Sequence, residues 1–231
     1  MSKTILISGA SRGIGLAIAR LFWNKGWNVA LCARNVEGLK KEFITQERKS
    51  AFIQSLDVKD KKSITLFAEE AIKQFAAVDV LVNNAGQFLP GKVHDEPDGT
   101  LEHLIETNLY SAYYLSRALV THMKERKTGS IYNICSVASL FAYPNGGSYS
   151  ISKFAMLGLS KALREELKSS NIKVTALLPG ATLTDSWAGA PYPESRFMKA
   201  EDIAQIIWDI EHLSPNTVVE EVLLRPVLGD I

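Results

Sequence analysis

The stretch Ser8-Gly9-Ala10-Ser11-Arg12-Gly13-Ile14-Gly15 decides the fold, because it follows a short apolar run, 4–8, and opens a segment with apolar residues at helical spacing. Glycines in a turn between a strand and a helix let backbone N–H groups and the helix N-terminus approach a pyrophosphate. Gly9 would allow the tight turn, and Gly13 and Gly15 the close approach. An ordinary strand-to-helix turn is the alternative, but the position after the first strand favours a dinucleotide site. The spacing is GxxxGxG and not GxGxxG, which indicates a relative of the commonest dinucleotide-binding fold.

Apolar or β-branched runs recur along the chain and alternate with longer segments of helical spacing. This pattern predicts seven strands and six helices. Such alternation is typical of a parallel sheet with helices on both faces and right-handed connections. We therefore expect a doubly wound, Rossmann-like α/β sheet with strand order 3-2-1-4-5-6-7. The predicted strands are 4–8, 28–33, 51–56, 78–82, 130–134, 173–178 and 218–224.

Length and composition indicate one globular unit. The chain has 231 residues, of which 46% are hydrophobic and 22% charged, so it can bury a sizeable core and is too apolar to stay disordered. We expect a single domain over residues 1–231. The irregular segment of about residues 181–199 is interpreted as a substrate loop and not as a domain boundary.

Charge and hydropathy exclude several partners. Lys plus Arg number 26 and Asp plus Glu 25, a net charge of +1, which argues against a nucleic-acid partner. No apolar run approaches the ~18 to 20 residues of a membrane helix, and glycines stand where a signal peptide needs an apolar stretch. We expect a cytoplasmic protein that does not bind a membrane.

Cysteine and histidine positions argue against a disulfide and a metal. Cys32 and Cys135 end the second and fifth predicted strands, which should be about 14 Å apart in this sheet. That is too far for a disulfide, so both thiols should be free, as in a reducing compartment. The four histidines show no metal-ligand spacing, so we interpret them as surface or capping residues and predict no structural metal.

The end of the second strand sets the cofactor preference. In folds of this type a carboxylate at this point binds the 2′-OH of the adenosine ribose. This chain instead reads Leu31-Cys32-Ala33-Arg34-Asn35 and has no carboxylate before Glu37. Arg34 and Arg12 could hold a 2′-phosphate through paired hydrogen bonds, although solvated surface arginines are the alternative. We predict NADP(H) in preference to NAD(H).

Tyr149 and Lys153 form a Tyr-x-x-x-Lys pair at the start of a helical segment, where positions i and i+4 share one face. Such a pair arises readily by chance, so the evidence comes from its neighbours. Ser136 lies at the C-terminal end of the fifth predicted strand and should reach the same crevice at the carboxyl ends of the strands. Asn108 interrupts the apolar face of the long predicted helix 101–123, so it is either a satisfied buried amide or functional.

Together these residues resemble the short-chain dehydrogenase/reductase family, in its compact NAD(P)-dependent branch, from Thr4 to about Thr184. The glycine stretch is similar to the family motif, with Ser8 where threonine is commoner. Asn108, Ser136, Tyr149 and Lys153 match the catalytic tetrad. Three further segments resemble the adenine contact, the motif after the fourth strand and the nicotinamide contact: Leu56-Asp57-Val58, Asn83-Asn84-Ala85-Gly86, and Pro179-Gly180 with Thr184.

The resemblance implies roles for these residues. Tyr149 would be the general acid, its pKa of ~10 lowered by the Lys153 cation. Ser136 would bind the carbonyl oxygen as hydride arrives, Lys153 would also hold the nicotinamide ribose, and Asn108 would hold a water that relays protons. The predicted cofactor-binding residues are Gly9, Ser11, Arg12, Gly13, Ile14, Gly15, Arg34, Asp57, Val58, Asn84, Ala85, Gly86, Tyr149, Lys153, Pro179, Gly180, Thr182 and Thr184.

The expected substrate side is apolar and aromatic, as in many ligand pockets, although plain packing is the alternative for any single residue. Few cations accompany it, with Lys92 and Arg196 as the exceptions. We therefore expect a hydrophobic or aromatic ketone or aldehyde, with a 3-oxoacyl thioester as an open alternative. The predicted substrate residues are Ser136, Phe88, Phe141, Tyr143, Tyr149 and Trp187, with Leu89, Leu140, Tyr192 and Phe197 beside them.

The sequence thus predicts an NADPH-dependent carbonyl reductase. A non-catalytic NADP(H)-sensing protein is one alternative, but a sensor does not need Ser136 and Tyr149. An epimerase or dehydratase is the other, although such relatives are usually longer. Apolar faces on segments 101–123 and 155–167, together with the family resemblance, predict a homodimer or homotetramer. The ending 218–226 departs from the glycine-rich ending of many relatives.

Overall fold

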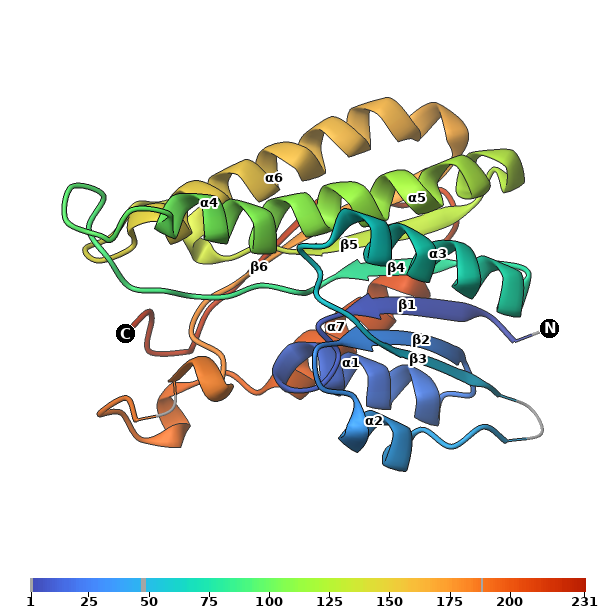
Figure 1. The fold of residues 1–231 in the computed structure, drawn as a ribbon, viewed down its shortest axis with the longest axis horizontal. Coiled ribbons are helices and arrows are strands. Elements are labelled where there is room, and N and C mark those ends of the chain that lie inside the picture. Colours follow the sequence, from blue (N-terminus) through green and yellow to red (C-terminus); the bar gives the residue numbers. More distant parts are fainter. Residues whose placement is uncertain (1, 47–48, 188) are drawn as a thin grey trace.

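The computed structural model describes residues 2–46, 49–187 and 189–231 and contains a seven-stranded sheet (Figure 1). The strand order is β3-β2-β1-β4-β5-β6-β7, as predicted, and every neighbouring pair is parallel. The strands are β1 (Thr4–Ser8), β2 (Asn28–Ala33), β3 (Ala51–Ser55), β4 (Val80–Asn83), β5 (Gly129–Ile134), β6 (Ile172–Pro179) and β7 (Glu221–Leu224).

The helices lie in two layers, one on each face of the sheet (Figure 1). On one face of the sheet, α1 and α7 pack against Ile5 and Ile7 of β1. On the other face, α3 and α5 pack against Leu6, which lies between these two residues in the sequence. Because both faces are covered, β1 is buried along its whole length, which explains its unbroken apolar run. The helices are α1 (Gly13–Asn24), α2 (Glu37–Glu42), α3 (Lys61–Phe75), α4 (Thr100–Ile105), α5 (Ser111–Arg126), α6 (Gly147–Leu167) and α7 (Ala200–Glu211).

The predicted helix over 101–123 is two helices. A π-helical turn, Glu106–Tyr110, separates α4 from α5. Single π-helical turns are rare, and those that occur are often found at functional sites. Asn108 lies in the middle of this turn, so the residue that interrupts the apolar pattern also marks the change in helix geometry.

Two sequence predictions concern the environment of the chain. Within the described ranges, no helix combines the length and the hydropathy required to cross a membrane. Cys32 and Cys135 are both buried free thiols. They lie on β2 and just after β5, which are separated in the sheet by β1 and β4.

Candidate active site

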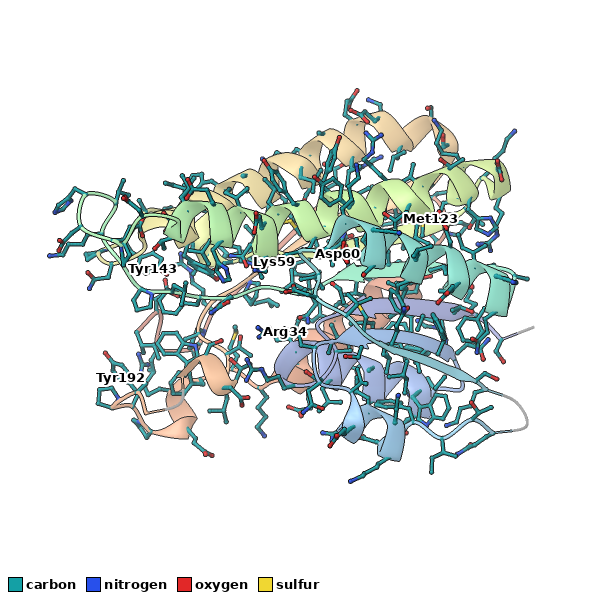
Figure 2. The ribbon with its side chains drawn as sticks, viewed as in Figure 1. Arg34, Lys59, Asp60, Met123, Tyr143 and Tyr192 are labelled. Atoms are coloured by element: carbon teal, nitrogen blue, oxygen red, sulfur yellow. The ribbon has the colours of Figure 1, made fainter. Side chains whose placement is uncertain are left out.

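A cavity of about 790 Å³ lies at the carboxyl ends of the strands. Open α/β sheets bind ligands at this edge, where the strand order reverses, here between β1 and β4. Pockets for small molecules commonly measure about 300–1,000 Å³. Arg34, Lys59 and Tyr143, which are labelled in Figure 2, all line this cavity. Every predicted cofactor-binding residue except Gly15 lines it too.

The turn between β1 and α1 is held against the loop after β4. Gly9 and Gly13 have φ of +66° and +54°, a conformation that side chains disfavour. The Asn84 side chain donates to the carbonyls of Ser8 and Gly9 at 3.0 and 2.9 Å. The Ser8 hydroxyl accepts from the backbone of Asn84 and Ala85, both at 3.1 Å. The serine that replaces the commoner threonine thus makes the link between the two loops.

Gly15 does not line the cavity, and its role in approaching the cofactor stays a prediction. A Cβ at this position would lie 2.5 Å from the carbonyl oxygen of Gly9 and would also meet the Asn84 amide. The residue is therefore required by packing beneath the turn. A side chain is likewise excluded at Gly9, because a Cβ there would lie 2.8 Å from the Cα of Ala85.

Three cations line the cavity near the segments predicted to contact the adenosine: Arg12, Arg34 and Lys59. Lys59 was not among the predicted residues, although it directly follows the predicted Asp57-Val58 contact. Arg12 pairs with Asp185 at 2.8 Å, and the two side chains are 66% and 63% exposed. Arg12 is therefore already engaged with the loop after β6, whereas Arg34 forms no ion pair with any described residue that would compete for a phosphate.

Ser136, Tyr149 and Lys153 all line the same cavity. Ser136 begins a short 3₁₀ turn after β5, where its hydroxyl accepts from the backbone of Ala138 at 3.1 Å. Tyr149 lies in the first turn of α6, and Lys153 follows one turn later. The Lys153 ammonium donates to the Ile134 carbonyl at 2.8 Å and lies 5.9 Å from the centre of the Tyr149 ring.

Burial sets the titration of this pair. It raises the pKa of Tyr149, and a hydrogen bond with the Ser136 hydroxyl lowers that pKa only in part. It also lowers the pKa of Lys153, whose side chain is almost fully enclosed. Both shifts have the same main cause, because desolvation disfavours the charged form of each buried group. The sequence led us to expect a lysine that lowers the tyrosine pKa, whereas the net shift of that pKa is upward.

Asn108 lies behind Lys153 and does not line the cavity. Its amide oxygen accepts from the backbone N–H of Gln87 at 2.7 Å, and its nitrogen donates to the Gln87 carbonyl at 3.0 Å and to the Ser152 hydroxyl at 2.9 Å. A Cβ on Gly86 would lie 3.3 Å from the Asn108 oxygen and 3.6 Å from the Lys153 ammonium. Asn108 is thus a satisfied buried amide that also lies close to the lysine ammonium, and its functional role stays a prediction.

The substrate side contains four of the predicted aromatic residues. Phe88 packs edge-on against the Tyr149 ring, with centroids 4.9 Å apart, and Phe141, Tyr143 and Trp187 also line the cavity. The four other residues expected beside them do not line it. Leu140 packs in a core cluster, Phe197 lies behind Trp187 at 5.3 Å, and Leu89 and Tyr192 (Figure 2) are also outside the lining.

The loop after β6 contributes residues to the cavity lining, with Ala188 outside the described residues, and its role as a substrate loop stays a prediction. Its two ends are joined, because Leu183 donates to the Met198 carbonyl and Met198 to the Ala181 carbonyl, at 2.8 and 3.0 Å. This pairing places Thr184 and Trp187 at the cavity.

Several polar lining residues were not predicted from the sequence: Gln87, Thr107, His103 and Asp230. His103 was interpreted as a surface or capping residue. Its ring nitrogen instead lies 2.9 Å from the Gln87 amide oxygen. Asp230 reaches the cavity because the Gly180 N–H bonds to the Leu224 carbonyl at 2.8 Å, which brings the segment after β7 over β6. Neither position carries a local sequence signal. Among the described residues, no group of three or more His, Cys, Asp or Glu could hold a metal ion.

Comparison with known proteins agrees with this geometry. A model of the family described as short chain dehydrogenase matches residues 3–193. Sepiapterin reductase of Chlorobaculum tepidum is 30% identical over 241 residues, covering 100% of this chain and 99% of that protein. A 3alpha-hydroxysteroid dehydrogenase of Mediterraneibacter gnavus is 31% identical, covering 96% and 94%. The solved alcohol dehydrogenase of Thermococcus sibiricus, complexed with 5-hydroxy-NADP, has a TM-score of 0.91 and 30% identity, covering 100% and 99%.

Proposed function

The chain belongs to the short-chain dehydrogenase family, and from this we propose that it is an NADPH-dependent reductase that converts a hydrophobic or aromatic ketone or aldehyde into an alcohol. One observation carries the proposal: Ser136, Tyr149 and Lys153 face one cavity whose other end has the features of a dinucleotide site. Family membership makes the protein an oxidoreductase. The cofactor preference, the substrate class and the residue roles are the proposal.

The cavity fits a dinucleotide that carries a 2′-phosphate. Gly9 and Gly13 present a bare backbone at the N-terminus of α1, where N–H groups favour a pyrophosphate. The end of β2 supplies Arg34 where a carboxylate would bind a ribose hydroxyl, and Lys59 adds a second positive charge. The NADP derivative in the Thermococcus sibiricus enzyme supports this assignment.

In this proposal Tyr149 is the proton donor. The reduced nicotinamide, when bound, supplies a hydride to the carbonyl carbon. The Ser136 hydroxyl donates a hydrogen bond to the carbonyl oxygen, and the Tyr149 phenol gives that oxygen its proton as negative charge develops. Because burial raises the tyrosine pKa, the phenol keeps its proton at neutral pH, which is the state that reduction requires.

Lys153 and Asn108 support the acid. The Lys153 ammonium is fixed by the Ile134 carbonyl and is free to donate its other hydrogens to the ribose hydroxyls. The oxygen of Asn108 lies close to the lysine, beside Gly86, and has a second lone pair for a water that relays protons to the lysine.

Apolar walls and the names of two relatives support the substrate class. Phe88, Phe141, Tyr143 and Trp187 provide aromatic surface, and the names sepiapterin reductase and 3alpha-hydroxysteroid dehydrogenase refer to ring substrates. A 3-oxoacyl thioester is the second substrate class to test. We also retain one domain over residues 1–231 with a substrate loop at about 181–199.

We further propose a homodimer or homotetramer. Tyr110, Tyr113, Ile151 and Phe154 are exposed on the π-helical turn, α5 and α6, and exposed apolar surface of this kind marks interfaces. Light scattering at micromolar concentration should give a multiple of the chain mass; a single monomeric mass contradicts the proposal. The free thiols support a reducing compartment such as the cytoplasm.

NADPH oxidation tests the function. Absorbance should fall with an aromatic or aliphatic ring ketone, measured against a panel that includes aldehydes and a 3-oxoacyl thioester. NADPH binding is measured separately by its fluorescence. Tight binding without oxidation of any carbonyl would instead favour a sensor of the dinucleotide.

A further inference from the structure

The first turn of α6, which carries Tyr149, begins without a cap of its own. Its N-cap residue is Gly146, and the turn contains no acidic residue. Asn145 and Gly147 on either side have φ of 60° and 32°, so the chain enters the helix through left-handed backbone. The start of a helix leaves backbone N–H groups without intrahelical partners, and these groups favour an anion. The turn therefore requires a partner from elsewhere in the chain.

Glu96 provides that partner from the loop between β4 and α4. One carboxylate oxygen accepts from the backbone N–H of Ser148 at 3.3 Å, and the other accepts from the Ser148 hydroxyl, across 52 positions of sequence. Ser148 is only 1% exposed. Hydrogen bonds to a carboxylate are stronger than those between neutral groups, so this contact anchors the residue directly before Tyr149.

Two glycines leave the room that this carboxylate occupies. A Cβ on Gly91 would lie 2.9 Å from a carboxylate oxygen of Glu96, and one on Gly147 would lie 2.8 Å from the same oxygen. Gly91 also donates its backbone N–H to the Asn145 carbonyl at 3.0 Å. The loop and the start of α6 are thus joined by backbone and side-chain contacts around one buried serine.

The same loop holds the tyrosine ring. Phe88, eight positions before Glu96, packs edge-on against Tyr149 with centroids 4.9 Å apart. The loop therefore makes two contacts at Tyr149. Phe88 contacts its ring, and Glu96 contacts the residue directly before it in the chain. We propose that Glu96 is a positioning residue, which fixes the first turn of α6 and thereby aims the Tyr149 phenol at the substrate carbonyl.

This proposal rests on the proposed reductase function and predicts a specific pattern of kinetic losses. Misplacing a reacting group by about 1 Å can reduce a rate about 100-fold. Glu96→Ala should therefore lower kcat about 10- to 100-fold, while the NADPH Kd stays within about twofold of wild type, because the adenosine end is untouched. Glu96→Gln keeps an acceptor for the Ser148 N–H and should recover most of the rate.

Asp95→Ala is the matched control, since it removes the same charge from an exposed position on the same loop. Its kcat should equal that of wild type. Unchanged kcat in Glu96→Ala would overturn the proposal. So would an equal loss in Glu96→Ala and Glu96→Gln accompanied by weaker NADPH binding, because that pattern indicates general damage to the fold.

Hydrogen exchange gives a readout that does not depend on turnover. Backbone amides of residues 148–151 should exchange faster in Glu96→Ala than in wild type or Asp95→Ala, and unchanged exchange there would overturn the proposal. If the wild-type protein oxidises NADPH with none of the carbonyls tested, the proposed reductase function is contradicted independently of Glu96. The exchange measurement still decides whether Glu96 holds the first turn of α6.

Discussion

The two ends of the cavity are built from different material. At the dinucleotide end the turn is closed by backbone, because Gly9 lies directly against Ala85 with no room for a further carbon atom, and three cationic side chains line the cavity beside it. At the substrate end the walls are side chains such as Phe141 and Tyr143, which are 55% and 40% exposed. The backbone packing at the first end leaves little room for a substitution, whereas the exposed side chains at the second can be exchanged more freely. If the proposed function is right, cofactor binding depends on the ends of strands and substrate choice on loops.

The largest effect should come from the group between the two ends. Tyr149→Phe removes the proposed proton donor and keeps the ring that packs on Phe88. General acid catalysis contributes about 100- to 10,000-fold, so kcat for carbonyl reduction should fall by that factor, with the NADPH Kd unchanged. Stopped-flow NADPH oxidation and a fluorescence titration measure the two quantities.

Tyr143→Phe is the matched control for this change. It removes the same hydroxyl from the other tyrosine that lines the cavity. Because this residue belongs to the substrate wall, its loss should alter KM and leave kcat within about threefold, well below the contribution of a general acid. Ordinary turnover by Tyr149→Phe would remove the tyrosine from the mechanism.

The second prediction tests whether the turn at Gly9 can accommodate an additional carbon atom. Gly9→Ala forces a side chain into left-handed backbone and into the Cα of Ala85. Gly26→Ala has the same kind of backbone, φ +85°, with nothing within 4 Å of the new carbon. The control should lower the free energy of unfolding by about 1 kcal/mol, and Gly9→Ala by about 1–3 kcal/mol more. Urea denaturation gives both values, and equal losses would mean that the turn can yield.

The dinucleotide end was largely predictable from sequence because its residues follow strands. Strands buried on both faces appear as apolar runs, and the residue that follows each run lies at one known edge of the sheet. The apolar runs alone therefore place Gly9, Asp57 and Asn84 at that edge. Spacing alone does not distinguish a glycine that faces the ligand from one that packs beneath the turn, as Gly15 does.

The substrate end was predictable only in part. Phe88 and Phe141 come soon after strands and were found, whereas His103 and Asp230 depend on how α4 and the segment after β7 approach the cavity. That approach is set by contacts between distant segments, such as the bond from Gly180 to Leu224. The upward shift of the Tyr149 pKa was not foreseen for a similar reason. Burial is a property of the whole fold and cannot be read from the Tyr-x-x-x-Lys spacing.

Reversing a charge should change which dinucleotide binds without altering the substrate end. Arg34→Asp removes the proposed partner of the 2′-phosphate and adds repulsion. A hydrogen bond to a charged group contributes about 1.5–3 kcal/mol, so the preference for NADPH over NADH should fall about 10- to 100-fold. Titration with both cofactors measures this. Lys92→Asp, the same reversal in the loop after β4, should leave the preference unchanged. Survival of both NADPH affinity and preference in Arg34→Asp would contradict the assignment.

The smallest expected effect is a difference between the two ends in how the free energy of unfolding depends on pH. Burial raises the pKa of Cys32, beneath the glycine turn, from 9.0 to about 12, and that of Tyr143, in the substrate wall, from 10.0 to about 12. Each group keeps its proton longer in the folded chain than in the unfolded one, so the unfolded state binds fewer protons at alkaline pH and stability falls as pH rises.

For Cys32 this loss begins near pH 9 and reaches about 1 kcal/mol at pH 10. For the half-buried Tyr143 it begins only above pH 10. Urea unfolding at pH 8 and pH 10 should therefore show a smaller decrease in Cys32→Ala than in wild type, while Tyr143→Phe should match wild type over that interval. An undiminished decrease in Cys32→Ala would mean that solvent reaches the thiol, and that the dinucleotide end is less tightly closed by its backbone than the packing of Gly9 on Ala85 implies.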